Sequence, residues 1–316
     1  MDEMIDVAVV GGGPAGLNGA LMLARSRRSV VVVDAGQPRN APASGVHGFL
    51  TRDGIPPAEL RRIAREEVAS YGARLVDDTV VEAARTADGF ELLLGTGGRL
   101  TARRLLVTTG LVDELPDIPG VRELWGSDVL HCPYCHGWEV RDQAIGVIAT
   151  GPMSTHQALL FRQLSDDIVV FAHTQPPTEE QRAELAARGI TVVEGEVASL
   201  DRADGRLAAV RLADGTSIPR HAVVVAPRFA ARSSLLESLG VDVVEEPGIG
   251  TRIVADDSGQ TNVPGVWVAG NVTDLSAQVV VAAAGGSWAA ARINADLVAE
   301  EVRLALSAPA VDRPAV

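Results

Sequence analysis

The chain has 316 residues and a formal charge of −13, from 28 basic and 41 acidic side chains, and every basic residue is arginine. The absence of lysine excludes a P-loop lysine, a lysine Schiff base and a lysine nucleophile. An acidic chain without a basic run is a poor ligand for nucleic acids and anionic membranes, and the 47% apolar content indicates one or two well-packed globular domains.

The first residues, Met1–Met4, are acidic and lack a basic n-region, so we expect no signal peptide. Apolar runs stay shorter than the roughly 18 residues that cross a bilayer. These features predict a cytoplasmic protein that does not enter the membrane. In that compartment a close pair of cysteines is usually catalytic or metal-binding.

The N-terminal third carries a pattern typical of a dinucleotide site. An apolar strand at 7–10 runs into Gly11-Gly12-Gly13-Pro14-Ala15-Gly16, a helical pattern follows, and a second strand at 29–33 ends at Asp34. Glycines in such a turn permit a tight bend and the close approach of a pyrophosphate, whose charge rests on the helix N-terminus. An acid at the end of the second strand accepts hydrogen bonds from the adenosine ribose. The candidate contacts are Gly11, Gly13, Gly16 and Asp34.

The middle of the chain repeats this unit with changes at the binding positions. Strands are again expected at 145–148 and 168–171, so the chain is predicted to hold two copies of one nucleotide-binding architecture. Ala149, Ser154 and Ala172 stand where the first copy has two glycines and the acid. We therefore expect the usual NADPH contacts to be lost, while binding of a nicotinamide cofactor through other contacts stays open.

The repeat predicts an α/β fold with two Rossmann-like, three-layer ββα domains. The first nucleotide-binding domain is expected to be discontinuous, formed by 1–113 and 230–316, with the degenerate domain inserted at 114–229. The proline-rich residues 115–120 are predicted to form the linker into the inserted domain. A helix rich in small residues is expected from Ala282 to about Val302. Residues 307–316, with two prolines and little periodicity, are expected to form a loose tail.

The two cysteines of the chain stand together in Cys132-Pro133-Tyr134-Cys135-His136-Gly137. A loop this short makes a poor structural disulfide, and a zinc site would need further convergent ligands. The C-x-x-C-H pattern is also the attachment motif of c-type haem, but haem attachment would require export of the protein, and no signal peptide is expected. A reversible redox disulfide is the favoured interpretation, with His136 as general base and His131 as a second candidate.

Further motifs make the chain similar to the low-molecular-weight thioredoxin reductases. Gly265–Asn271 followed by Gln278-Val279 resembles their second FAD contact, with Asn271 in place of an aspartate, and Thr108-Thr109-Gly110 resembles their A-T-G element. The C-P-Y-C-H-G motif and the degenerate second unit resemble the FAD-dependent dithiol oxidases of gliotoxin and holomycin biosynthesis. The resemblance implies FAD as cofactor, and its further contacts would be Pro14, Ala15, Arg39, Asn40, His47, Thr109, Gly110, Gly270, Asn271, Gln278 and Val279.

The same resemblance implies an enzyme of antibiotic biosynthesis. It would oxidise a small-molecule dithiol to a disulfide and pass the electrons to O2, releasing H2O2. It assigns exchange with the substrate to Cys132 and reaction with the flavin to Cys135. The alternative is a thioredoxin-disulfide reductase that draws electrons from NADPH or another donor, and a third hypothesis is a redox sensor without turnover.

The resemblance also implies a homodimer. Trp125, Trp138, Trp267 and Trp288 are possible interface anchors, although each is more often a core residue. If no nicotinamide binds, rotation of the inserted domain has no purpose. We then expect a fixed arrangement with the cysteine pair beside the flavin.

Overall fold

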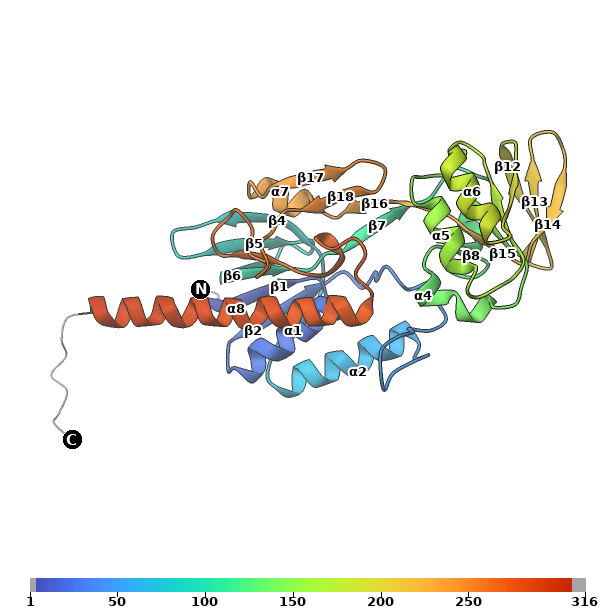
Figure 1. The fold of residues 1–316 in the computed structure, drawn as a ribbon. Coiled ribbons are helices and arrows are strands. Elements are labelled where there is room, and N and C mark those ends of the chain that lie inside the picture. Colours follow the sequence, from blue (N-terminus) through green and yellow to red (C-terminus); the bar gives the residue numbers. More distant parts are fainter. Residues whose placement is uncertain (1–3, 309–316) are drawn as a thin grey trace.

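The computed structural model describes residues 4–308, which form two α/β units lying end to end (Figure 1). The first unit is built from both ends of the chain, and the inserted unit from its middle. Both contain parallel sheets, so the predicted fold class is confirmed. No helix within residues 4–308 is long and apolar enough to cross a membrane.

The first unit is organised around a seven-stranded sheet of order β3-β2-β1-β6-β5-β4, with β19 also paired to β6. Four valines fill β2, and β1 is equally apolar, as expected of strands that are covered on both faces. The strands are β1 (Ile5–Val10), β2 (Val30–Asp34), β3 (Arg74–Asp77), β4 (Val80–Arg85), β5 (Phe90–Leu94), β6 (Arg99–Val107) and β19 (Val266–Val268).

Three helices cover one face of this sheet, namely α1 (Pro14–Arg25), α2 (Pro57–Ser70) and α8 (Val279–Ser307). Helices α1 and α8 pack closely because glycines face each other: a Cβ on Gly286 would lie 1.9 Å from the carbonyl oxygen of Ala15. The other face is covered by α7 (Ser234–Ser238) and a four-stranded sheet. The result is the predicted three-layer arrangement.

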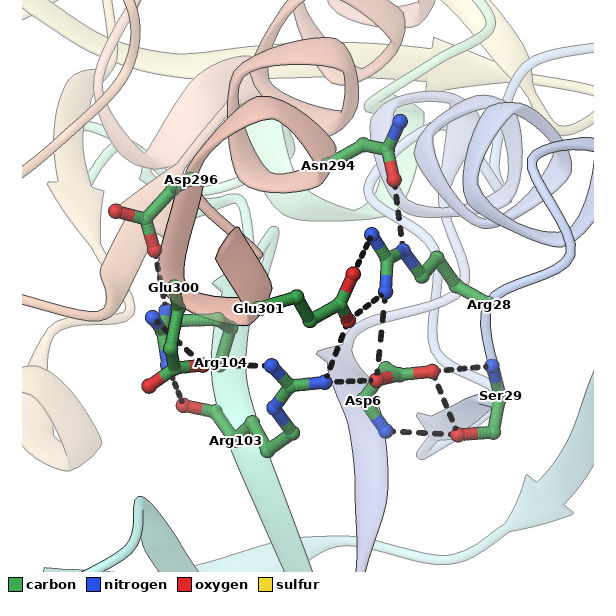
Figure 2. A network of polar contacts seen from close by, with 9 residues as sticks. All are labelled: Asp6, Arg28, Ser29, Arg103, Arg104, Asn294, Asp296, Glu300 and Glu301. Atoms are coloured by element: carbon green, nitrogen blue, oxygen red, sulfur yellow. Dashed lines mark hydrogen bonds and ion pairs between the residues drawn. The ribbon is translucent and has the colours of Figure 1, made fainter. Parts of the chain in front are cut away.

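Ion pairs fix the C-terminal half of α8 to the central strands β1 and β6 of the sheet (Figure 2). Arg103 of β6 lies 2.7 Å from Asp6, 2.6 Å from Glu300 and 3.1 Å from Glu301. Helix α8 extends beyond the predicted end near residue 302, and Ser307 belongs to it rather than to a tail. The remainder of the predicted tail, 309–316, lies outside the described residues.

The inserted unit has a parallel sheet of order β11-β10-β9-β15-β8. A three-stranded sheet, β12-β13-β14, covers one face, and α5 and α6 cover the other. Its elements are α3 (Val121–Leu124), β8 (Val129–Leu130), α4 (Pro133–His136), η1 (Trp138–Val140), β9 (Ile145–Ile148), α5 (Ser154–Phe161), β10 (Ile168–Phe171), α6 (Glu179–Ala187), β11 (Thr191–Val193), β12 (Val197–Ala203), β13 (Arg206–Leu212), β14 (Ser217–Pro219) and β15 (Ala222–Val224).

An antiparallel pair of strands connects the two units. Strand β7 (Leu111–Glu114) leads into the insertion and β16 (Arg228–Ala231) leads out of it, with Leu111 opposite Ala231. The domain boundaries proposed at 113/114 and 229/230 fall within these strands. The sheet β17-β18-β16-β7 is completed by β17 (Val243–Glu246) and β18 (Gly250–Ile253), and the turn η2 (Gly270–Val272) precedes α8.

Candidate active site

One cavity of about 1300 Å³ joins the glycine turn of the first unit to the cysteine pair of the inserted unit. Residues from distant parts of the chain meet there because β1, β6 and β19 are neighbours in the sheet and β7 brings the insertion alongside. The cavity is lined by Cys132, Cys135, His131, His136 and every predicted cofactor contact except Gly16.

The turn between β1 and α1 needs its glycines for different reasons. Gly11 has a φ of +105°, and a Cβ there would lie 2.5 Å from the carbonyl oxygen of Thr108. Gly16 is in α1, where a Cβ would lie 1.9 Å from the carbonyl oxygen of Gly11. Gly16 therefore permits helix–strand packing and lines no part of the cavity. Gly13 has open space around its missing side chain, which suits the close approach of a pyrophosphate.

Asp34 lies at the end of β2, as predicted, and is paired with Arg61 of α2. Arg61 was not identified from the sequence. Helix α2 begins 23 residues after Asp34, and nothing in its sequence shows that one of its arginines pairs with this carboxylate. The carboxylate is only 13% exposed and faces the cavity beside the glycine turn, where it suits a ribose hydroxyl.

Asn271 uses both donor hydrogens of its amide within the protein. Its Nδ2 donates to the carbonyl oxygens of Asp274 and Ala277 at 3.0 and 2.9 Å, while Oδ1 accepts from Arg39 at 3.2 Å. A carboxylate at this position would face two carbonyl oxygens with no proton to donate. This explains the amide where the resembling family has an acid, and the second lone pair of Oδ1 can still accept from a cofactor hydroxyl.

The cysteine pair is disulfide-bonded, with Cα atoms 5.3 Å apart. Cys132 is the N-cap of α4 and Pro133 occupies its first turn, so the motif lies where a loop enters a helix. The backbone N–H of Cys135 donates to Cys132 Sγ at 3.2 Å. Cys135 is exposed and Cys132 is half-buried, so a dithiol reaches the bond from the cavity.

Burial favours the uncharged form of both histidines beside the disulfide, His131 and His136. Burial lowers the pKa of His136 below its ordinary value of 6.5, and His47 adds to this effect, although Glu139 and Asp128 oppose it. His47 Nε2 lies 3.5 Å from Glu139 Oε1, which joins the first unit to the segment after the cysteines. A neutral imidazole accepts a proton, as a general base for thiols requires.

His131 occupies a more enclosed position. Burial lowers its pKa too, and the nearby Arg39 adds to this effect, while a hydrogen bond to Val225 and the charge of Asp113 oppose it. Its ring packs edge-on against Phe229 at 5.1 Å between centroids, and Arg39 stacks on that ring at 5.1 Å. Phe229 and Asp113 line the cavity and were missed from the sequence, because neither belongs to a motif.

These features agree with what is known of related proteins. A family model described as pyridine nucleotide-disulphide oxidoreductase matches residues 5–286. The chain belongs to this family. The thioredoxin reductase tcpT of Claviceps purpurea is 31% identical over 313 residues, covering 94% of this chain and 96% of its own.

Two solved structures extend the comparison. The crystal structure of HlmI has a TM-score of 0.91 at 47% identity and covers 97% of both chains. An oxidoreductase from Agrobacterium tumefaciens has a TM-score of 0.89 at 37% identity, covering 94% of this chain and 99% of its own. The predicted class is confirmed: the chain is a thioredoxin reductase-like disulfide oxidoreductase, a class that carries a flavin and acts on disulfides or dithiols.

Within this oxidoreductase, the turn after β9 corresponds to the glycine turn of the first unit, and the Ser154 hydroxyl contacts its backbone. The N–H of Gly151 points to Ser154 Oγ at 3.3 Å, and Ala149 is 1% exposed. Gly248, between β17 and β18, packs on Pro152, where a Cβ would lie 3.0 Å from the proline ring. A hairpin of the first unit thus rests on the turn that corresponds to the phosphate-binding turn of the first copy.

Proposed function

We propose that this oxidoreductase is an FAD-dependent dithiol oxidase, which converts a small-molecule dithiol to an intramolecular disulfide with O2 as acceptor and H2O2 as product. The observation that carries the proposal is the shared cavity. The glycine turn and the Cys132–Cys135 disulfide line one space, whereas Ala149 and Gly151 of the second turn do not line it. Electrons from a thiol therefore have a short route to the first nucleotide site.

The first site fits FAD by shape and by donor chemistry. The open space at Gly13 suits the pyrophosphate, Asp34 suits the adenosine ribose, and Asn271 Oδ1 suits the ribitol. When bound there, FAD supplies a two-electron acceptor for the cysteine pair and a donor for O2.

The thiol chemistry belongs to the chain itself. A substrate thiolate attacks Cys132 Sγ, the Cys132–Cys135 bond breaks, and its electron pair leaves on Cys135. His136 removes the proton of the second substrate thiol, which attacks the mixed disulfide and releases Cys132. The substrate leaves as a disulfide and the cysteine pair holds its two electrons. These roles follow the resemblance, and the N–H donated to Cys132 Sγ supports a thiolate on the released Cys132.

A fixed arrangement of the two units forms part of the proposal. The contact of Gly248 with Pro152, the ion pair of Arg39 with Asp113 and the approach of His47 to Glu139 all lie at the junction of the units. Rotation of the inserted unit would separate some of these contacts. Ala149, Ser154 and Ala172 stand in place of the two glycines and the acid of the first unit, so rotation would bring no nucleotide to the flavin.

An anaerobic titration tests the proposal. Two equivalents of dithiothreitol, one for the Cys132–Cys135 disulfide and one for FAD, should bleach the flavin of the FAD-loaded enzyme. NADPH should leave the flavin oxidised, and admission of air should restore it with release of H2O2. The name of tcpT favours a second candidate, reduction of a protein disulfide by NADPH. Complete bleaching by stoichiometric NADPH would establish that candidate instead.

We also propose a cytoplasmic homodimer that acts on a natural product in antibiotic biosynthesis. Trp267 is 2% exposed and belongs to the core, and Trp125 is half-buried, so neither is an interface anchor. Trp138 and Trp288 are 63% and 52% exposed, and Val281 of α8 is 48% exposed. Light scattering should give twice the chain mass of 33.0 kDa.

A further inference from the structure

Gln157 of α5 is a buried amide in the wall of the cavity, and neither the motifs nor the proposed function assigns it a role. Its side chain is 5% exposed. Its Nε2 lies 3.1 Å from the carbonyl oxygen of His131 and 3.0 Å from His131 Nδ1. Its Oε1 is buried without a hydrogen-bond partner among residues 4–308. A buried oxygen without a hydrogen-bond partner destabilises the folded protein, so packing alone does not favour an amide at this position.

The surroundings fix the orientation of this amide. Turning it over would place Oε1 against the carbonyl oxygen of His131, where two acceptors repel each other. The NH2 group therefore faces His131, with one hydrogen for the carbonyl oxygen and the other directed at Nδ1. The same Nδ1 lies 3.2 Å from the carbonyl oxygen of Val225, so a donor and an acceptor compete for it.

This competition decides where the imidazole carries its proton. If Nδ1 is protonated it donates to Val225 but meets the N–H of Gln157. If Nδ1 is unprotonated it accepts from Gln157 at the shorter distance, and the proton lies on Nε2. Nε2 makes no hydrogen bond to a residue within 4–308, and His131 lines the cavity directly before Cys132 in the chain.

We propose that Gln157 is a positioning residue that holds His131 in the Nε2–H tautomer, so that a neutral imidazole presents an N–H donor to the cavity beside the disulfide. This donor stabilises the negative charge that develops on sulfur when a thiolate opens the Cys132–Cys135 bond. His131 gives up no proton in the step, and His136 remains the base. The inference rests on the proposed function only for the identity of the attacking thiol.

The charges around His131 make its neutral form the relevant one. Burial and Arg39 disfavour the imidazolium, Asp113 and the carbonyl of Val225 favour it, and the net effect lowers its pKa. Above that pKa the wild type keeps an N–H on Nε2 because Gln157 selects that tautomer. Without Gln157, Val225 alone directs the proton to Nδ1, and Nε2 then carries a hydrogen only when the ring is protonated.

Three variants separate this role from a structural one. Gln157→Leu removes the donor, Gln157→Glu replaces it with an acceptor of the same shape, and Gln163→Leu changes an exposed amide just after α5 as a control. The rate of flavin reduction by dithiothreitol is measured anaerobically between pH 5 and 9. In Gln157→Leu the rate should fall as the pH rises through the pKa of His131, because Nε2 then loses its hydrogen. The pH profiles of the wild type and Gln163→Leu should lack this descending limb. In Gln157→Glu the carboxylate favours the imidazolium, so the limb should lie at higher pH than in Gln157→Leu.

Nitrogen NMR of the FAD-loaded enzyme reads the tautomer without turnover, with the His131 signals assigned from a His131→Gln variant. We expect an unprotonated Nδ1 in the wild type and a protonated Nδ1 in both Gln157 variants. A protonated Nδ1 in the wild type, or equal pH profiles in all variants, would overturn the inference. Failure of dithiothreitol to reduce the wild-type flavin would instead overturn the proposed function, while the NMR result would still decide the role of Gln157.

Discussion

The guanidinium of Arg39 forms two hydrogen bonds to the carboxylate of Asp113, with Nε–Oδ2 and Nη2–Oδ1 distances of 2.8 and 2.6 Å. Asp113 belongs to β7, and Arg39 to the loop after β2, so the pair joins the first unit to the strand that leads into the insertion. The same guanidinium contacts Asn271 Oδ1 and the ring of Phe229. One ion pair thus organises the middle of the cavity.

Asp113→Asn should lower the free energy of unfolding by about 1–3 kcal/mol, because the half-buried Arg39 loses its counter-charge. FAD affinity should fall as well, since Arg39 lines the proposed cofactor site. Urea denaturation and FAD titration of the apoprotein measure the two effects. Glu114→Gln is the matched control, since Glu114 is the next residue and pairs with Arg228 in solvent, where an ion pair contributes at most about 1 kcal/mol. Equal behaviour of the two variants would contradict the prediction.

Replacing each cysteine separately tests the roles assigned to the pair. Both Cys132→Ser and Cys135→Ser should abolish dithiol-dependent O2 uptake, because neither can form the disulfide. The Cys135 thiolate that remains in Cys132→Ser should give a charge-transfer absorbance with FAD, and the Cys132 thiolate in Cys135→Ser should not. Absorbance spectra between pH 6 and 9 measure this. The opposite pattern would exchange the two roles.

His136→Gln should reduce the rate of flavin reduction by dithiothreitol at pH 7 by about 100-fold or more, the range for loss of a general base. Burial lowers the pKa of His136 below 6.5, so its basic form prevails at pH 7 and is lost on acidification. The wild-type rate should therefore fall below pH 6.5 along a limb that the variant lacks. His221→Gln, at an exposed position of the inserted unit, is the control. A variant that retains the limb would show that another group is the base.

The glycine turn and the strands of both units were predictable because the interactions that form them are local. A glycine turn between a buried strand and a helix requires adjacent residues, and the strands predicted at 145–148 and 168–171 coincide with β9 and β10. The structure of the cysteine motif was equally predictable, because Cys132 and Pro133 begin the turn of helix that holds Cys135.

Contacts between distant segments were not predictable. Arg39 and Asp113 are 74 residues apart, and Gln157 and His131 are 26 apart. Each of these side chains is an ordinary choice for a loop, strand or helix, and only tertiary packing of distant elements brings them together. The length of α8 was underestimated for a similar reason, since its last turns are held by arginines of β6.

Asn271→Asp should destabilise the protein, although the substitution restores the acid of the resembling family. The amide donates to two carbonyl oxygens, and a carboxylate replaces both bonds with repulsion, at a cost of about 1–3 kcal/mol. Thermal unfolding measures the loss. Asn294→Asp is the control, because Asn294 uses its oxygen to accept from Arg28, and a carboxylate serves there equally well. Unchanged stability of Asn271→Asp would show that the loop at 274–277 does not depend on the amide.

Arg103→Met should release the C-terminal half of α8 from the sheet. Arg103 is 21% exposed and pairs with Asp6, Glu300 and Glu301 (Figure 2), so its loss leaves excess negative charge around the end of the helix. We expect the free energy of unfolding to fall by about 1–3 kcal/mol, and this loss should shrink as salt screens the remaining charges. Proteolysis after residue 296 should also become faster.

The matched control is Arg99→Met on the same strand, where an exposed arginine pairs only with Glu91 among the described residues. Its effect should stay within about 0.5 kcal/mol. Equal proteolysis of the two variants would show that packing against α1, rather than charge, holds the end of α8.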